Sequence, residues 1–231
     1  MNAVFFDLFP LSVFQDKIIL SQDEKNKLID YIFKTEEDTK KIKKISKDDA
    51  WLGDSKGHEF LLKNSIMQKL EKLISTKIRL YAEMLDINTS KLEFFYQRSW
   101  ATITRESERI KPHSHVQSNI SFAYYLLKPE NSGDLRFNSE PQNEIATGLF
   151  SGENVSLGLL KKVNIRNTPN ADVNVKEDDI VIFPSKARHS TIPNQTKKPR
   201  ISISGDITIM LKDSTGYEKI MPHYNSWQPL S

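Results

Sequence analysis

The residues with the clearest capacity for chemistry are the five histidines, His58, His113, His115, His189 and His223. His113 and His115 form an H-x-H pair, and residues two apart in an extended segment point to the same face. Two imidazoles side by side can hold one metal ion, so the pair predicts a metal site, although such pairs also occur on surfaces by chance. His58 and His223 belong to no pattern, and we expect surface or structural roles for them.

His189 lies in a second informative segment, residues 180–204, where two apolar stretches flank a polar turn near residues 193–198. We expect a hairpin that brings His189 near Arg200, with Ser202 on the same face as Arg200. An arginine inside an apolar strand is costly unless it is paired, and segment 180–204 contains no acidic residue. A guanidinium binds a carboxylate with two parallel hydrogen bonds, so a bound small-molecule carboxylate would compensate the buried charge of Arg200. An edge position in water, or a distant Asp or Glu, are the alternatives.

Tyrosines on a nearby stretch offer a further polar group. Tyr124 and Tyr125 precede the segment Gly133-Asp134-Leu135-Arg136-Phe137. A phenol on a strand beside the metal pair could donate a hydrogen bond to the same carboxylate. A core position is the commoner role for any one tyrosine, and it stays open here.

The elements that must position these residues are helices first and strands afterwards. Ser21 and Glu24 have the spacing of a capping box, and apolar residues follow at helical spacing, so we expect a helix over about 22–34. A second helix is expected from Ser65, with Gln68 completing a cap. Its apolar stripe carries Ile66, Leu70, Leu73, Ile74, Ile78, Tyr81 and Leu85. From residue 92 the period shifts toward two, and short runs predict strands at 92–98, 100–104, 119–127, 135–137, 180–183 and 201–210.

This order of elements predicts a single α+β, mainly β domain over residues 1–231. Its helical part, about residues 1–90, would pack on one face of a β-sandwich or jelly-roll core, about residues 91–212. The charged stretch 35–58 and the Asn- and Gly-containing stretch 138–178 read as long connections, and we consider both as lids.

Composition narrows the class of protein. With 38% hydrophobic and 27% charged residues, the composition is that of a globular protein, and the chain has no cysteine. Disulfides, thiolate zinc sites and iron–sulfur clusters are therefore excluded. The formal net charge is only +3, and the lysine cluster at residues 40–47 is flanked by acids, so we expect no nucleic-acid partner. We find no signal peptide and no membrane span, and expect a cytoplasmic protein.

Read jointly, these motifs resemble the Fe(II)- and 2-oxoglutarate-dependent oxygenases. The shared features are the H-x-H pair, the strand ending in YYL, a G-x-L-x-F segment, the distal histidine and the arginine eleven residues later. The resemblance is greatest to a bacterial and phage group with an LFP motif, here Leu8-Phe9-Pro10, a tryptophan before the H-x-H, here Trp100, and a final FPS…H…PN…RISIS stretch. It runs from about residue 8 to 207, and the final stretch is its most specific part.

The resemblance implies a double-stranded β-helix with Fe(II) as cofactor and 2-oxoglutarate as cosubstrate. His113 and His189 would be imidazole ligands, and Arg200 would bind the distal carboxylate of 2-oxoglutarate with help from Tyr125 and Ser202. His115 stands where most relatives carry a carboxylate, and this leaves three possibilities. It is a third ligand, it swings aside for water or another carboxylate, or it is the ligand in place of His113.

The activity implied is hydroxylation of a small molecule or peptide with release of succinate and CO2. Trp100, Phe122 and Tyr124 are candidates for the pocket wall. Two other functions stay open at this point. One is a three-histidine, cupin-like metalloenzyme that does not use 2-oxoglutarate, and the other is a non-catalytic jelly-roll module.

Overall fold

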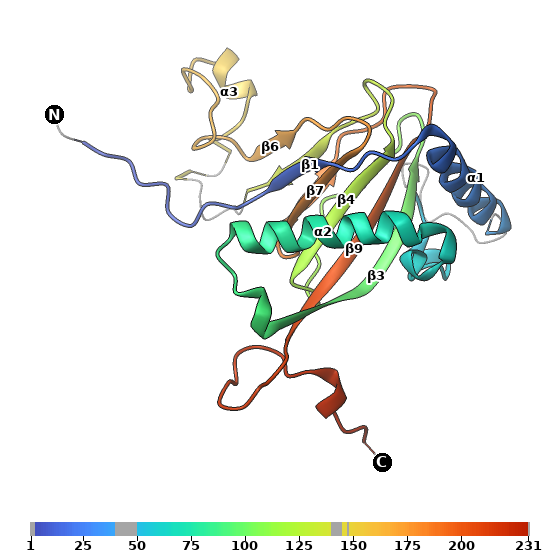
Figure 1. Cartoon of the computed structure of the whole chain (residues 1–231). Helices are drawn as coiled ribbons and strands as arrows, with labels where there is room; N and C mark the ends of the chain where they lie inside the picture. Colours follow the sequence, from blue (N-terminus) through green and yellow to red (C-terminus); the bar gives the residue numbers. More distant parts are fainter. Residues whose placement is uncertain (1–2, 40–49, 140–144, 147, 231) are drawn as a thin grey trace.

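The computed structural model describes residues 3–39, 50–139, 145–146 and 148–230 (Figure 1). It contains three α-helices, nine strands and several 3-10 turns within these residues. The helices are α1 (Gln22–Asp38), α2 (Gln68–Met84) and α3 (Glu153–Ser156). The strands are β1 (Phe14–Lys17), β2 (Trp51–Leu52), β3 (Leu92–Thr104), β4 (Ile120–Leu127), β5 (Leu135–Asn138), β6 (Asn170–Val173), β7 (Asp179–Pro184), β8 (His189–Thr191) and β9 (Arg200–Leu211). The 3-10 turns are η1 (Asp54–Lys56), η2 (Leu61–Lys63), η3 (Ser65–Met67), η4 (Thr89–Lys91) and η6 (Tyr224–Ser226).

The strands form two antiparallel sheets. The larger has the order β1-β7-β4-β9-β3-β2, and the smaller has the order β6-β5-β8. A cluster that includes Tyr125, Phe137 and Phe183 fills the space between the two sheets. The predicted α+β, mainly β jelly-roll fold is therefore confirmed, and α1 and α2 lie along one side of the larger sheet (Figure 1).

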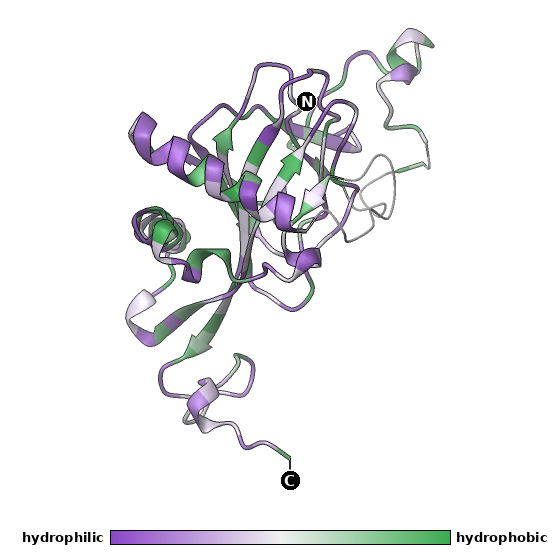
Figure 2. Ribbon diagram, turned by 90° about the vertical axis from the view of Figure 1, so that its right-hand side faces the viewer, coloured by the Kyte–Doolittle hydropathy of each residue, from purple (hydrophilic) through white to green (hydrophobic). Residues whose placement is uncertain are grey.

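Alternation along the central strands explains this layering. On β7, Ile180 and Ile182 belong to the large core under the helices, whereas Val181 and Phe183 belong to the core between the sheets. Both faces are apolar because each has a layer packed on it, as expected for a buried strand. Figure 2 shows hydrophobic residues concentrated in the strands and hydrophilic residues on the outer side of the long helices.

The two long helices follow the predicted pattern with one difference at a cap. Ser21 and Glu24 form the expected capping box at the start of α1. The buried stripe of α2 includes Leu70, Ile74 and Ile78, as predicted. The cap at Ser65 and Gln68 was wrong: residues 65–67 form a 3-10 turn, and α2 begins without a side-chain cap. The chain is already wound before Gln68, since the Met67 amide donates to the Asn64 carbonyl, so the amides that a serine would cap are occupied.

Two strand predictions need correction. Residues 92–104 form one long strand, β3, with an irregularity between Tyr96 and Arg98. The hairpin over 180–204 was wrong, because β7 and β9 lie in the larger sheet and β8 pairs with β5 in the smaller one. The chain crosses from one sheet to the other after β7 and returns before β9. Sequence periodicity identifies such strands but not the sheet that each one joins.

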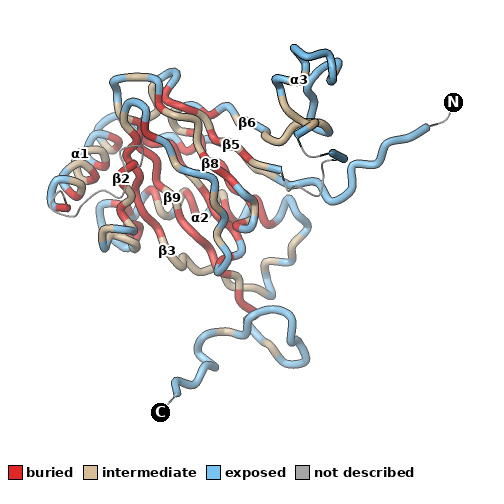
Figure 3. Tube along the Cα trace, turned by 180° about the vertical axis from the view of Figure 1, so that it is seen from behind, coloured by how far each residue is buried: buried red, intermediate tan, exposed pale blue. Residues whose placement is uncertain are grey.

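The connections between these elements are only partly described. The lysines at residues 40–47 lie outside the described residues, as does part of each stretch considered as a lid, 35–58 and 138–178. The described parts contribute three elements that periodicity did not indicate, β2, α3 and β6. Figure 3 shows exposed chain at the N-terminal arm, around α3 and at the C-terminal end. Among the described residues, no helix combines the length and apolarity needed to cross a bilayer.

Candidate metal centre

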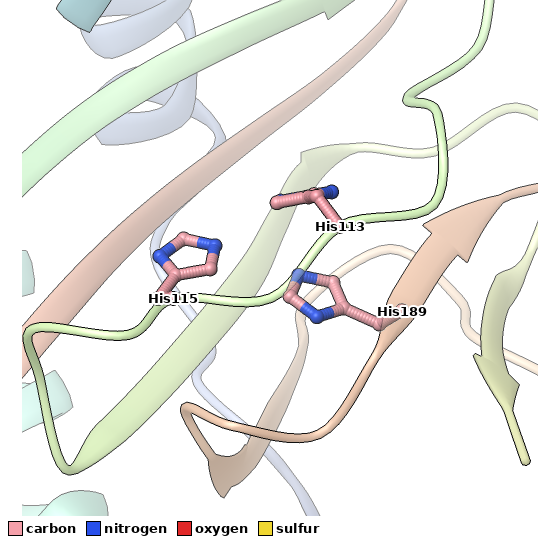
Figure 4. A group of neighbouring side chains, drawn as sticks. All are labelled: His113, His115 and His189. Atoms are coloured by element: carbon pink, nitrogen blue, oxygen red, sulfur yellow. The ribbon is translucent and has the colours of Figure 1, made fainter. Parts of the chain in front are cut away.

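Three histidines from two segments meet at one end of the space between the sheets (Figure 4). His189 opens β8, and His113 lies beside it through two backbone hydrogen bonds of 2.9 and 2.8 Å. The His115 amide donates to the Ser185 carbonyl at 2.9 Å, which anchors the second half of the H-x-H pair. The candidate ligand atoms of the three imidazoles all lie within 4.8 Å of one another. The same-face prediction for His113 and His115 holds, although neither belongs to a named strand.

The hydrogen bonds of the outer ring nitrogens select the tautomers. Nδ1 of His113 lies 2.8 Å from the Lys111 carbonyl oxygen, and Nδ1 of His189 lies 2.9 Å from the Ala187 carbonyl oxygen. A carbonyl can only accept, so both Nδ1 atoms donate, and each Nε2 keeps its lone pair. Nε2 of His115 is buried and has no hydrogen-bond partner among the described residues. The three rings thus offer lone pairs toward one point.

Burial keeps these rings in the form that binds metals. His189 is only 8% exposed. Burial lowers its pKa to about 3, and the neighbouring His113 adds to the effect. Burial also lowers the pKa of His113. Neutral imidazole is the ligand form, so no proton has to leave before a cation binds at neutral pH.

A carboxylate that the sequence reasoning missed stands behind His115. Nδ1 of His115 lies 2.7 and 2.8 Å from the two carboxylate oxygens of Asp206, which is fully buried. Asp206 follows Arg200, Ser202 and Ser204 at intervals of two on β9, so it shares their face of the sheet. Asp206 is the one acidic residue of β9, and this was the available signal.

The donor set fits a divalent cation. Three imidazole nitrogens converge, one of them buried and without a hydrogen-bond partner among the described residues, and hydrogen bonds to the outer nitrogens hold the rings in place, as is usual for metal-binding histidines. Imidazole suits Fe(II), Zn(II) and other first-row ions. Of the three possibilities for His115, the arrangement agrees with a third ligand, because its ring is locked toward the other two by Asp206.

Arg200 lies at the far end of the same face and is 1% exposed. Its guanidinium donates to the carbonyls of Ser132 and Gly133 at 3.0 and 2.8 Å, and to the hydroxyls of Thr104 and Thr191 at 3.2 and 3.1 Å. These acceptors are neutral, and no carboxylate forms a salt bridge with this cation in the part of the chain described. Burial lowers its pKa, as expected for an uncompensated cation.

The residue of β8 that contacts Arg200 differs from the predicted one. Because β8 and β9 face each other from different sheets, the contact across the gap is made by Thr191 and not by His189. Tyr125 and Ser202 line the cavity, together with Thr191. Burial raises the pKa of Tyr125 to about 12, so its hydroxyl stays protonated and can donate.

One cavity joins the histidines to this far end. It has a volume of about 730 Å³, within the usual range for ligand sites. Trp100 forms one wall and stacks on His115, with ring centroids 5.8 Å apart. Phe122 also lines the cavity, but the prediction for Tyr124 was wrong. Tyr124 points to the opposite face, where its hydroxyl donates to the Ile18 carbonyl, because it alternates with Tyr125 along β4.

Several solved structures have a similar fold, and their identities to this chain are low. The 2-oxoglutarate-dependent epimerase SnoN of nogalamycin biosynthesis has 14% identity, covers 96% of this chain and 89% of its own, and gives a TM-score of 0.56. A Pseudomonas putida prolyl-4-hydroxylase has 14% identity, covers 87% and 95%, and gives 0.51. HygX from Streptomyces hygroscopicus, with nickel and 2-oxoglutarate bound, has 11% identity, covers 86% and 83%, and gives 0.50. A comparison with curated proteins found no match.

The family model described as "Putative 2OG-Fe(II) oxygenase" matches residues 98–206. The matched segment begins at Arg98 on β3 and ends at Asp206, and it contains the three clustered histidines and Arg200. The match covers a little under half of the chain, and together with the shared fold it shows that the chain is similar to the 2OG-Fe(II) oxygenases.

Proposed function

We propose that the protein is an Fe(II)- and 2-oxoglutarate-dependent oxygenase that hydroxylates a small molecule or a peptide. The observation that carries the proposal is the convergence of three imidazoles at one end of a cavity whose other end is backed by Arg200, a buried arginine without a salt bridge in the described part of the chain. A cation site and an anion site at opposite ends of one pocket suit a metal and a dicarboxylate cosubstrate. We propose the cytoplasm as its compartment, where reducing conditions favour Fe(II).

In this proposal His113, His115 and His189 hold the iron. Fe(II), when bound with 2-oxoglutarate, supplies the oxidising chemistry that no protein side chain provides, with CO2 and succinate as by-products. The chain supplies the arrangement. Three imidazoles held in place by hydrogen bonds to their outer nitrogens would bind the ion, and the adjoining cavity would leave room for the cosubstrate.

The distal carboxylate of 2-oxoglutarate lies, in this proposal, at the end lined by Thr191, Tyr125 and Ser202. Three hydroxyls there can donate hydrogen bonds, and Arg200 adds a positive charge directly behind Thr191. A carboxylate at this point would pair with a guanidinium that no described acidic residue neutralises.

The substrate occupies the outer part of the cavity. This part is lined by the two tryptophans Trp51 and Trp100 and by the Arg98–Asp54 ion pair, whose atoms are 2.6 Å apart. Flat apolar walls with a paired charge at the mouth accept a small molecule or an extended peptide. Hydroxylation is the simplest outcome for a substrate held there, whereas structural neighbours also include an epimerase and a carbocyclase.

A turnover assay tests the proposal. Purified protein with Fe(II), ascorbate and 2-oxoglutarate is expected to form succinate, with extra succinate when a substrate is present. His113→Gln removes one ligand and should abolish succinate formation. His223→Gln changes a histidine that pairs with Glu93 outside the cluster and should leave it unchanged. Folded, iron-loaded protein that forms no succinate with any substrate of a broad panel would refute the function.

A further inference from the structure

Asp206 poses an electrostatic problem that the cosubstrate site does not solve. The carboxylate is fully buried, and among the described residues it forms no salt bridge to a lysine or an arginine. A buried charge without compensation is costly, and among the described residues the His115 imidazole is the only ionisable side chain in an ion pair with Asp206. Such a charge is retained only where something positive lies close by.

The surroundings hold this carboxylate in one position. The Ser121 hydroxyl donates to Asp206 at 2.7 Å. That hydroxyl continues into a chain with the hydroxyls of Ser185 and Ser118, with oxygen–oxygen distances of 2.9 Å. All three serines are buried. The network orients the carboxylate toward Nδ1 of His115, and Nε2 on the opposite side of the same ring is the orphaned donor of the metal centre.

We infer that Asp206 is a positioning residue that supplies, through His115, the negative charge lacking from a ligand set of three neutral histidines. This role rests on the proposed metal site. The usual set of two histidines and one carboxylate carries one negative charge at the metal. Here the negative charge belongs to Asp206, which contacts the far side of the His115 ring and not the metal position itself. A hydrogen-bonded carboxylate makes the imidazole a stronger donor and fixes its orientation, so the ion and Asp206 compensate each other across the ring.

The inference predicts two effects of Asp206→Asn, one on metal affinity and one on the melting temperature of the metal-free protein. Asparagine keeps the shape and the acceptor for the Nδ1 proton but removes the charge. Metal affinity should fall about 10- to 100-fold, the usual loss for an outer-sphere carboxylate. The metal-free protein should melt at the same or a higher temperature, because an uncompensated buried charge is gone. A carboxylate with a purely structural role would instead lower the melting temperature on substitution.

The experiment uses Co(II) as the probe, at pH 8, where histidine is ordinarily neutral. Affinity is measured by competition with a chelator, and the visible Co(II) absorption reports the ligand geometry. Asp172→Asn is the matched control, since Asp172 is part of an ion pair with Arg136 on the smaller sheet, and it should bind as the wild type does. His115→Asp combined with Asp206→Asn returns one charge to the ligand set, and should recover at least 10-fold of the lost affinity.

The outcomes separate the two hypotheses. A wild type that binds no Co(II) would overturn the metal site and, with it, the role of Asp206. A wild type that binds Co(II), with an Asp206→Asn variant of equal affinity, would overturn only the inference. A loss of affinity accompanied by a lower melting temperature of the metal-free variant, and not recovered in the double variant, would also overturn it.

Discussion

Acidification should lower the free energy of unfolding of the metal-free protein, because His189 takes up a proton in the unfolded chain before it does so in the folded protein. The pKa of this imidazole falls from an ordinary value of 6.5 to about 3 because the ring is buried beside His113. In the folded protein the ring therefore stays neutral at pH 5, whereas in the unfolded chain it takes up a proton below pH 6.5. The contribution of the neutral His189 ring to the free energy of unfolding is therefore fully present above pH 6.5 and is lost as the pH falls toward 3.

The size of the effect follows from the pH interval. Each pH unit below 6.5 costs about 1.4 kcal/mol while the folded state stays unprotonated. Lowering the pH from 7 to 5 should therefore reduce the free energy of unfolding by about 2 kcal/mol through His189 alone. Other groups also contribute, so the quantity to compare is the loss in the wild type against the loss in a variant without this imidazole.

The assay is urea denaturation of chelator-treated protein at pH 7 and pH 5, for the wild type and for His189→Gln. The variant should lose about 2 kcal/mol less than the wild type over this interval. Asp172→Asn, which leaves the histidines intact, should lose as much as the wild type does. Equal losses in the wild type and in His189→Gln would refute the claim that the ring is held neutral by burial.

Four further substitutions test other parts of the structure. Thr191→Val removes a hydroxyl at the Arg200 end of the cavity, and should raise the KM for 2-oxoglutarate by about 2- to 10-fold with unchanged Co(II) affinity. Gly133→Ala should lower stability by at least about 2 kcal/mol in thermal melts, because φ is +89° and the new Cβ would lie 2.0 Å from a carbonyl oxygen. Gly148→Ala, with open space around it, should cost about 1 kcal/mol. Lys25→Met should cost about 3 kcal/mol in urea denaturation, since it strands two carboxylates 2.6 and 2.8 Å from the lost ammonium; a change below 1 kcal/mol would mean that the pair is solvated.

Local chemistry was readable from the sequence. The capping box at Ser21 lies where two residue types and their spacing predict it. The strands β4, β7 and β9 begin and end within one residue or two of the apolar runs that predict them. The H-x-H spacing placed His113 and His115 side by side. Each of these features depends on residues a few positions apart, which backbone geometry alone relates.

The composition of the far end of the site was only partly readable. Because segment 180–204 has no acidic residue, a bound carboxylate, an edge position in water and a distant acid all stayed open for Arg200. The structure buries Arg200 and gives it neutral acceptors, with no salt bridge within the described residues. Thr191 and Gly133, which hold the guanidinium, come from two other segments. No periodicity links them to Arg200, because their contact depends on how the smaller sheet lies over the larger one.

The amino-acid sequence by itself determined the two long helices, the central strands β3, β4, β7 and β9, and the residues able to bind a metal, because these follow from side-chain type and short-range spacing. Only the tertiary structure decided that β8 pairs with β5 in the smaller sheet and does not form the expected hairpin with β9. Only it set Asp206 behind His115, 91 positions apart in the chain. The physical reason is that the choice of sheet and the pairing of buried charges are settled by packing and by the cost of desolvation, which act between segments wherever the fold brings them together.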